Sequence, residues 1–179
     1  MSSLLDSSIF IYYLSQALGC NQNDVHGFVI GGHGDKTMIP LVKYATYKGF
    51  PVSLLLPKEK LDEIVKATMA GGNTLTKLLG KNGWVTPGAS ISRLVESIIK
   101  DEKKVIPCSV YLNGEYGLKD MAIGVPAVIG RNGIEKVITM DLDGKELELF
   151  NSSAKAVKET QDLLKELKKR RFLKINKDI

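Results

Sequence analysis

The stretch Phe28-Val29-Ile30-Gly31-Gly32-His33-Gly34-Asp35 is the most informative part of this 179-residue sequence. Its apolar start is typical of a buried strand, and the glycines that follow predict a tight turn at a sheet edge. The turn leaves His33 with little around it, two residues before a carboxylate. Because the ordinary pKa of histidine lies close to neutrality, an accessible histidine in such a place can give and take a proton. A loop histidine beside a glycine-rich turn explains the same pattern equally well.

Helices are expected on both sides of this turn. Apolar residues recur at helical spacing over residues 5–18, 57–69 and 90–99. Gly71-Gly72 interrupts the second of these helices, and the leucines that follow predict either a continuation of one long helix or a kinked second one. Residues 84–87 are expected to form a connector.

The later part of the chain is rich in strand-forming residues. Three such segments, 105–112, 121–129 and 137–142, are each followed by residues typical of hairpin turns: Asn113-Gly114, Arg131-Asn132-Gly133 and Asp143-Gly144. Shorter extended pieces are expected at 25–30, 38–41 and 51–56.

A final helix is predicted over residues 152–172, with Ser152 and Ser153 as candidate N-caps. Its buried stripe would consist of Ala156, Val157, Thr160, Leu163, Leu164 and Leu167. Helices that flank an antiparallel sheet predict an α+β fold.

The composition is that of an ordinary globular protein, with 44% hydrophobic and 25% charged residues. The length fits one domain over residues 1–179. No apolar run is long enough for a membrane span, and the N-terminus lacks the features of a signal peptide. Cys20 and Cys108 lack the spacing of a metal site or a disulfide framework, so we expect no metal and a reducing, cytoplasmic location.

Basic residues concentrate near the C-terminus, between Lys165 and Lys177, in a chain of net charge +5. A basic tail can contact nucleic acid, but the solvated end of a helix explains the same composition better. The sequence has none of the zinc-finger, RNA-recognition or helix-turn-helix patterns. We therefore expect no nucleic-acid partner.

Several co-linear motifs together resemble the malate branch of the lactate/malate dehydrogenase family, over about residues 4–170. The motifs are Leu5-Asp6-Ser7-Ser8, the glycine-flanked histidine at 31–35, Pro107-Cys108, Asn113-Gly114-Glu115-Tyr116-Gly117, Gly124-Val125-Pro126 and Ile129-Gly130. Their order and separation match those of the family's C-terminal substrate domain. The resemblance implies that domain's α+β fold and the reversible, NAD-dependent oxidation of malate to oxaloacetate.

The resemblance implies roles for two residues. His33 would be the general acid/base that takes the hydroxyl proton of malate and returns it to oxaloacetate. Asp6 would hold the imidazole through a hydrogen bond, which fixes its tautomer and raises its pKa. Considered alone, Asp6 is equally well explained as a carboxylate favoured by the helix dipole near a helix start.

Three positions depart from the family pattern. Ile9 stands where the family has the arginine that clamps the substrate carboxylate, so its substrate-binding role is doubtful. Lys36 makes the loop after the histidine look one residue longer, which a bulge would absorb or which would re-aim His33. The segment 81–87 looks one residue shorter, and its Trp84 is either a wall of the substrate pocket or, the interpretation favoured slightly here, a half-buried core aromatic.

The family's NAD-binding half, with its Gly-x-Gly-x-x-Gly motif, has no counterpart in this sequence. We therefore expect the substrate half alone, from a truncated or split gene, with NAD bound only through a separate Rossmann half. Such a chain would expose an apolar face and form homo-oligomers. The alternative is a non-catalytic remnant or interaction module that keeps the fold.

Overall fold

The computed structural model describes residues 1–81 and 83–175, apart from the side chains of 165, 166 and 168–175. Its four α-helices are α1 (Ser2–Leu18), α2 (Lys58–Leu79), α3 (Val85–Ile99) and α4 (Gly144–Ile175). Its strands are β1 (Val25–His26), β2 (Val29–Gly31), β3 (Met38–Pro40), β4 (Thr46–Tyr47), β5 (Phe50–Pro51), β6 (Lys104–Asn113), β7 (Lys119–Gly130) and β8 (Gly133–Val137).

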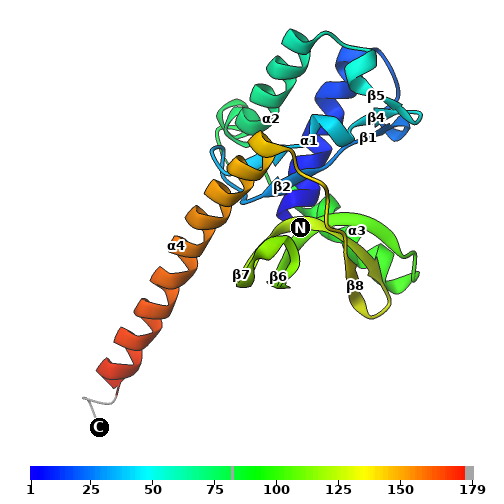
Figure 1. Ribbon diagram of the computed structural model, residues 1–179. Helices are drawn as coiled ribbons and strands as arrows, with labels where there is room; N and C mark the ends of the chain where they lie inside the picture. Colours follow the sequence, from blue (N-terminus) through cyan, green and yellow to red (C-terminus); the bar gives the residue numbers. More distant parts are fainter. Residues whose placement is uncertain (82, 176–179) are drawn as a thin grey trace.

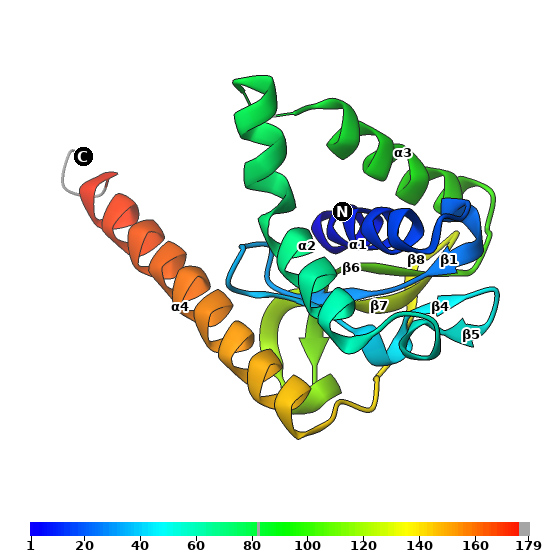
Figure 2. The ribbon, with the colours of Figure 1, turned by 90° about the horizontal axis from the view of Figure 1, so that it is seen from above.

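The larger sheet is antiparallel throughout. Its strands run in the order β3-β2-β7-β6, and β8 also pairs with β7. The helix α1 lies over one face of this sheet, between α2 and α3, and α4 starts on the other face (Figure 2). A small second sheet, β1-β4-β5, flanks the end of α1 (Figure 1). The predicted α+β fold is confirmed.

Two clusters of buried apolar side chains stabilise this arrangement. One lies between the large sheet and the start of α4, where the Phe150 ring is fully buried. The other lies beneath α1, where Phe10 and Leu14 are fully buried against β2, β3 and α2. Each aromatic or leucine side chain so buried contributes on the order of 1.5–3 kcal/mol to stability. The helix α1 is therefore held firmly on the sheet.

The helix α1 approaches the sheet most closely where two glycines pair. Gly31 of β2 faces Gly124 of β7, which is the one pairing between these strands in the described structure. A Cβ at Gly124 would lie 2.0 Å from Ser3 Oγ of α1 and 2.6 Å from the Gly31 carbonyl oxygen. Hydrogen atoms in place of side chains thus let the first turns of α1 contact the strand.

The region around α2 differs from the prediction in two places. The helix α2 runs unbroken through Gly71-Gly72, so the expected interruption is wrong and the continuous alternative is correct. The segment expected to be extended over 51–56 instead forms a 3₁₀ turn over Val52–Leu54, with Val52 fully buried. Similarly, the strand expected over 25–30 is split into β1 and β2.

The start of α4 also differs from the prediction. The Glu146 amide donates to Asp143 Oδ1 (2.9 Å), and the Asp143 amide donates to Glu146 Oε2 (3.0 Å). This reciprocal pair is a capping box, so Asp143-Gly144 begins a helix and is not a hairpin turn. Ser152 and Ser153 consequently lie within α4 and cap nothing. The strand expected over 137–142 is also wrong, because β8 spans Gly133–Val137 and shares only Val137 with that segment.

The predicted buried stripe of α4 is only partly correct. Val157 is half-buried, but Leu163, Leu164 and Leu167 are 56%, 56% and 52% exposed. The reason is that α4 extends away from the rest of the molecule beyond its first turns (Figure 1). Most side chains of the basic tail lie outside the described residues. In the described part of the chain, each helix is too short or too polar to cross a lipid bilayer.

Candidate active site

The structure brings His33 and Asp6 together. Asp6 lies in the second turn of α1, and His33 lies in the turn that follows β2. Asp6 Oδ2 and His33 Nδ1 are 2.9 Å apart. The Asp6 side chain is only 3% exposed, whereas that of His33 is 53% exposed. A buried carboxylate thus binds one ring nitrogen of a histidine whose side chain is otherwise half exposed.

Ser7, the residue after Asp6, fixes the position of α1 along the sheet. Ser7 Oγ accepts a hydrogen bond from the Val29 amide at 2.8 Å, and both residues are buried. This bond joins α1 to β2 four residues before His33. It therefore sets the register between the helix that carries the carboxylate and the strand that leads to the histidine.

The turn around His33 depends on glycine. Gly31 has a φ of +92°, which L-residues rarely adopt. A Cβ at Gly32 would lie 2.6 Å from Thr37 Oγ1, so a side chain there would collide with the turn. The amides of Thr37 and Met38 both donate to the Gly34 carbonyl oxygen, at 2.8 and 3.0 Å. The turn is consequently compact and closed on itself.

The turn accommodates Lys36 without displacing the histidine. The pairing of β2 with β3 stays in register from Val29 to Gly31 on one strand and from Met38 to Pro40 on the other. The preceding turn residue, Asp35, accepts a hydrogen bond from Asn73 of α2. The extra residue was expected either to be absorbed by a bulge or to re-aim His33. The structure shows the His33 ring directed at Asp6.

The surroundings raise the pKa of His33 above its ordinary value. The largest cause is the hydrogen bond with Asp6, which partial burial of the ring opposes. The negative charges of Asp6 and, more weakly, Asp35 raise the pKa further. Because Nδ1 donates to Asp6, Nε2 is left as the ring nitrogen that can exchange a proton.

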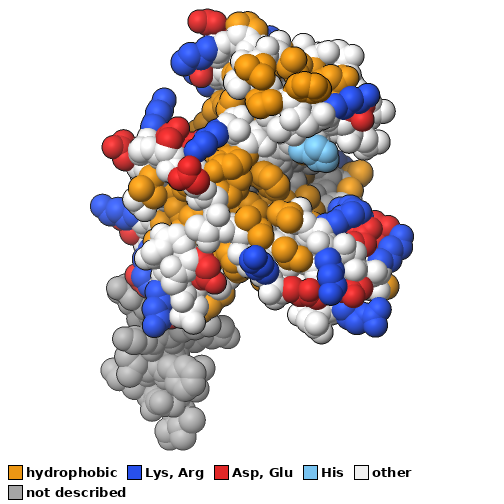
Figure 3. Space-filling model, turned by 45° about the vertical axis from the view of Figure 1, so that its right-hand side comes forward, with side chains coloured by type: hydrophobic (Ala, Val, Ile, Leu, Met, Phe, Trp, Pro, Cys, Tyr) orange, Lys and Arg blue, Asp and Glu red, His pale blue; other side chains and the backbone are white. Residues whose placement is uncertain are grey.

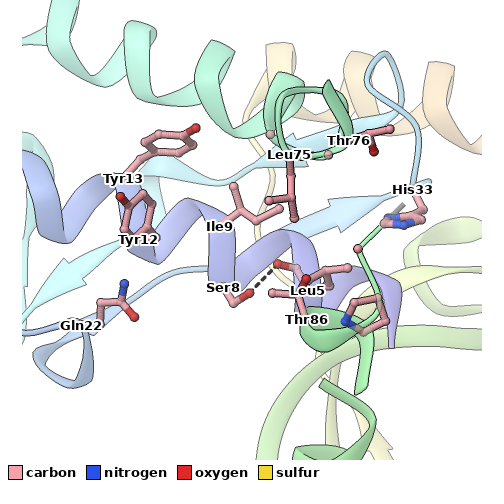
Figure 4. A pocket seen from close by; sticks show the side chains of 14 residues that line it. Leu5, Ser8, Ile9, Tyr12, Tyr13, Gln22, His33, Leu75, Thr76 and Thr86 are labelled. Carbon is pink, nitrogen blue, oxygen red and sulfur yellow. Dashed lines mark hydrogen bonds between the residues drawn. The ribbon is translucent and has the colours of Figure 1, made fainter. Parts of the chain in front are cut away.

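His33 borders a cavity of about 620 Å³ between α1, α2 and the start of α3 (Figure 4). The cavity is mainly apolar, and Ile9 and Leu75 project into it side by side (Figure 4). The side chains that line it, among the described residues, include no lysine and no arginine. A substrate carboxylate would therefore find hydroxyl and amide groups and the His33 ring here, but no lysine or arginine from this part of the chain.

Ile9 also has a packing role. A Cβ on Gly71 of α2 would lie 2.8 Å from Ile9 Cγ2. The isoleucine thus fills the space that the glycine leaves open, which brings α1 and α2 together at the cavity wall. The doubt about Ile9 as a substrate-binding residue rests on its chemistry, because an aliphatic side chain offers no hydrogen bond.

Trp84 does not lie in the core. Its side chain is 79% exposed, so the slightly favoured interpretation as a half-buried core aromatic is wrong. It lines a second cavity of about 500 Å³ that shares Leu75, Gly83 and Thr86 with the cavity beside His33. The connector around it is short because α3 already begins at Val85.

The tyrosine of the Gly114–Gly117 motif has a structural role. Tyr116 adopts a left-handed conformation (φ 55°), and its ring packs against Phe150 of α4 with centroids 4.9 Å apart. Its hydroxyl donates to the Ile138 carbonyl oxygen (2.8 Å) and accepts from the Met140 amide (3.1 Å). Tyr116 thus fastens the irregular connector between β8 and α4.

Sequence reasoning missed the contact of Ser153 with the site. Its buried hydroxyl bonds to the backbone of the His33 turn, although its position near a predicted helix start had suggested an N-cap.

Within the described residues, no three histidine, cysteine, aspartate or glutamate side chains cluster as a metal site would require.

Comparison with known proteins identifies the family and the fold. The family described as the lactate/malate dehydrogenase alpha/beta C-terminal domain matches residues 4–168. A malate dehydrogenase of Parabacteroides distasonis is 60% identical over 167 residues, 93% of this chain and 53% of the relative. One of Bacteroides thetaiotaomicron is 59% identical over the same share of each chain. This chain therefore spans about half the length of the curated relatives it matches.

Solved structures agree. The malate dehydrogenase of Salinibacter ruber superposes with a TM-score of 0.91 at 38% identity, over 95% of this chain and 55% of that one. A lactate dehydrogenase of Eimeria maxima, solved with NADH and oxamate, gives 0.89 at 36% identity, over 94% and 54%. Family match, sequence identity and superposition all point the same way: the chain belongs to the lactate/malate dehydrogenase family, as its C-terminal alpha/beta domain.

Proposed function

We propose that this chain supplies the proton-transfer half of a malate dehydrogenase active site, for the reversible oxidation of malate to oxaloacetate. The observation that carries the proposal is the 2.9 Å pairing of a buried Asp6 with a half-exposed His33 at the edge of a cavity. About half of its relatives' length lies outside the part matched here, so the activity of the whole assembly is part of the proposal.

In this proposal His33 Nε2 takes the proton of the substrate hydroxyl as the carbonyl forms. Asp6 keeps the neutral ring in the tautomer with Nδ1 protonated, and it stabilises the imidazolium once the proton has moved. In the reverse direction the imidazolium returns the proton to the new hydroxyl oxygen. The raised pKa of His33 favours the protonated form that oxaloacetate reduction requires.

The cavity fits one part of NAD and not the other. Its apolar wall at Leu75, Thr86 and Pro87 suits a flat nicotinamide ring, and NAD when bound would accept the hydride. The sequence holds no Gly-x-Gly-x-x-Gly turn to bind the diphosphate. We therefore propose a complementary nucleotide-binding half as partner, and no tight NAD binding by this chain alone.

One observation favours a second candidate, a non-catalytic module that keeps the fold. Ile9 replaces the carboxylate-binding arginine that the family resemblance leads us to expect. In this second candidate the chain would retain its contact surfaces but bind neither oxaloacetate nor NAD. Calorimetry with oxaloacetate separates the candidates, since micromolar binding of oxaloacetate by the chain would exclude the second.

A complementation experiment tests the first candidate. The chain is mixed with the separately produced N-terminal half of the Parabacteroides distasonis relative, and NADH oxidation by oxaloacetate is followed. We expect turnover that His33→Gln abolishes and that His26→Gln, at the chain's other histidine, leaves unchanged. Background rates at every ratio of the two halves would count against the proposal.

We further propose that the chain self-associates and resides in the cytoplasm. Hydrophobic side chains group together on the face shown in Figure 3, and Leu78, Trp84 and Val85 are 79%, 79% and 86% exposed. Such exposed apolar surface favours association. Cys20 and Cys108 are both free thiols, in keeping with a reducing compartment. Strictly monomeric elution at high concentration would refute the association.

A further inference from the structure

We propose that Ser153 of α4 is a positioning residue for His33, because its buried hydroxyl holds both ends of the turn that carries the histidine. The consequence for catalysis rests on the proposed function, in which His33 exchanges the proton. The placement of the ring itself does not depend on that function and is measured without turnover.

The hydroxyl of Ser153 makes two hydrogen bonds across the turn. Its Oγ accepts from the Gly32 amide at 2.9 Å and donates to the Thr37 carbonyl oxygen at 2.6 Å. Gly32 directly precedes His33, and Thr37 is the last residue before β3. One hydroxyl therefore joins the entry and the exit of the turn to α4, with its donor and an acceptor site both used.

The packing around Ser153 leaves room for little else. Ser153 is only 3% exposed. A Cβ at Gly31 would lie 2.8 Å from Ser153 Oγ, and one at Gly32 would lie 3.0 Å from Val157 Cγ2. Because Gly31 and Gly32 have no side chains, α4 can pack against the backbone of the turn, and Ser153 can hydrogen-bond to that backbone.

The turn has a second bond that would survive loss of the hydroxyl. The Gly32 amide also lies 3.1 Å from the Thr37 carbonyl oxygen, in a backbone hydrogen bond. The hairpin of β2 and β3 is closed by this bond and by its own register. Removal of the hydroxyl should therefore leave the hairpin folded but free its turn from α4.

His33 is in this way held from two sides. The helix α1 holds the ring through Asp6, and α4 holds the backbone on which the ring stands through Ser153. A turn released from α4 would let the ring drift from the carboxylate. Because the hydrogen bond to Asp6 is the main cause of the raised pKa of His33, that pKa reports the placement.

The test is a nitrogen-15 NMR titration of the imidazole rings in the 179-residue chain. In Ser153→Ala we expect the pKa of His33 to fall toward the ordinary value and the preference for the Nδ1-protonated tautomer to weaken. Ser152→Ala, at the exposed neighbour in α4, should leave both unchanged.

Two results would overturn the proposal. One is an unchanged pKa and tautomer of His33 in a folded Ser153→Ala chain. The other is unfolding of Ser153→Ala where Ser153→Thr, which keeps the hydroxyl, folds, since the hydroxyl would then serve the fold. In the complementation assay Ser153→Ala should lower kcat and leave KM unchanged. If the unaltered chain shows no turnover in this assay, only the proposed function is refuted, because the titration does not need turnover.

Discussion

Restoring an arginine at position 9 tests directly whether the cavity beside His33 is a carboxylate site. Ile9 lines that cavity together with Leu75, and its aliphatic side chain offers a carboxylate nothing. In Ile9→Arg the guanidinium would start from the same wall, three residues and less than one helical turn after Asp6. We expect the variant to bind malate more tightly than the unaltered chain does.

The size of the gain follows from the contacts. Two charge-assisted hydrogen bonds to a carboxylate contribute about 3–6 kcal/mol together. Ordering the long side chain costs about 2 kcal/mol, and some packing against Gly71 is lost. A net gain of about 2 kcal/mol remains, which corresponds to about thirtyfold in the dissociation constant.

Calorimetry with malate measures the effect, and Ile9→Gln is the matched control. Glutamine is long, flexible and polar but uncharged, so it repeats the packing change without the ion pair. Circular dichroism establishes that both variants fold. If Ile9→Arg binds malate no better than Ile9→Gln while both are folded, the cavity is not a carboxylate site and the assignment of position 9 fails.

Three further changes have definite expected outcomes. The pairing of Asp6 with protonated His33 should contribute fully to the free energy of unfolding below a pH of about 6.5, the ordinary pKa of histidine, and this contribution should be lost as the pH rises through the raised pKa of His33. Urea unfolding measures it: the difference in the free energy of unfolding between Asp6→Asn and the unaltered chain should shrink over that pH range. Ser7→Ala leaves the buried Val29 amide without its acceptor and should lower the free energy of unfolding by about 1–3 kcal/mol, measured the same way. Gly124→Ala places a methyl group 2.0 Å from Ser3 Oγ of α1 and 2.6 Å from the Gly31 carbonyl oxygen of β2, and should cost about 1–3 kcal/mol in thermal or urea unfolding. An unchanged midpoint would show that both α1 and β2 can move away from β7 at this point.

The parts of the fold that local signals determine could be predicted. The long hairpin of β6 and β7 has strand-forming residues on both sides of a glycine turn, and the two-residue turn after Gly130 has a strong hairpin sequence. The pairing of Asp6 with His33 followed from the family resemblance. Neither residue's periodicity would have joined them, since 27 positions separate them in the chain.

What could not be predicted depends on tertiary contacts. Gly71 stays helical because Ile9 of another helix fills the space beside it, and propensity alone cannot show that. The start of α4 is an exception, because its signal is local: Asp143-Gly144 resembles a hairpin turn, and Glu146 three residues later reveals the capping box. Ser153 is a polar residue whose partners lie 116 and 121 positions away.

Tyr116 has a consequence for the order in which the chain folds. Its ring can meet Phe150 and its hydroxyl can meet Met140 only after the turn between β6 and β7 has put it in the left-handed conformation. The hairpin is local in sequence and forms fast, whereas α4 must close a loop of 34 residues to dock. We therefore expect the hairpin to be an early folding unit and α4 to dock late. Amide hydrogens near Phe150 should then gain protection after those of β6 and β7 in pulse-labelling experiments.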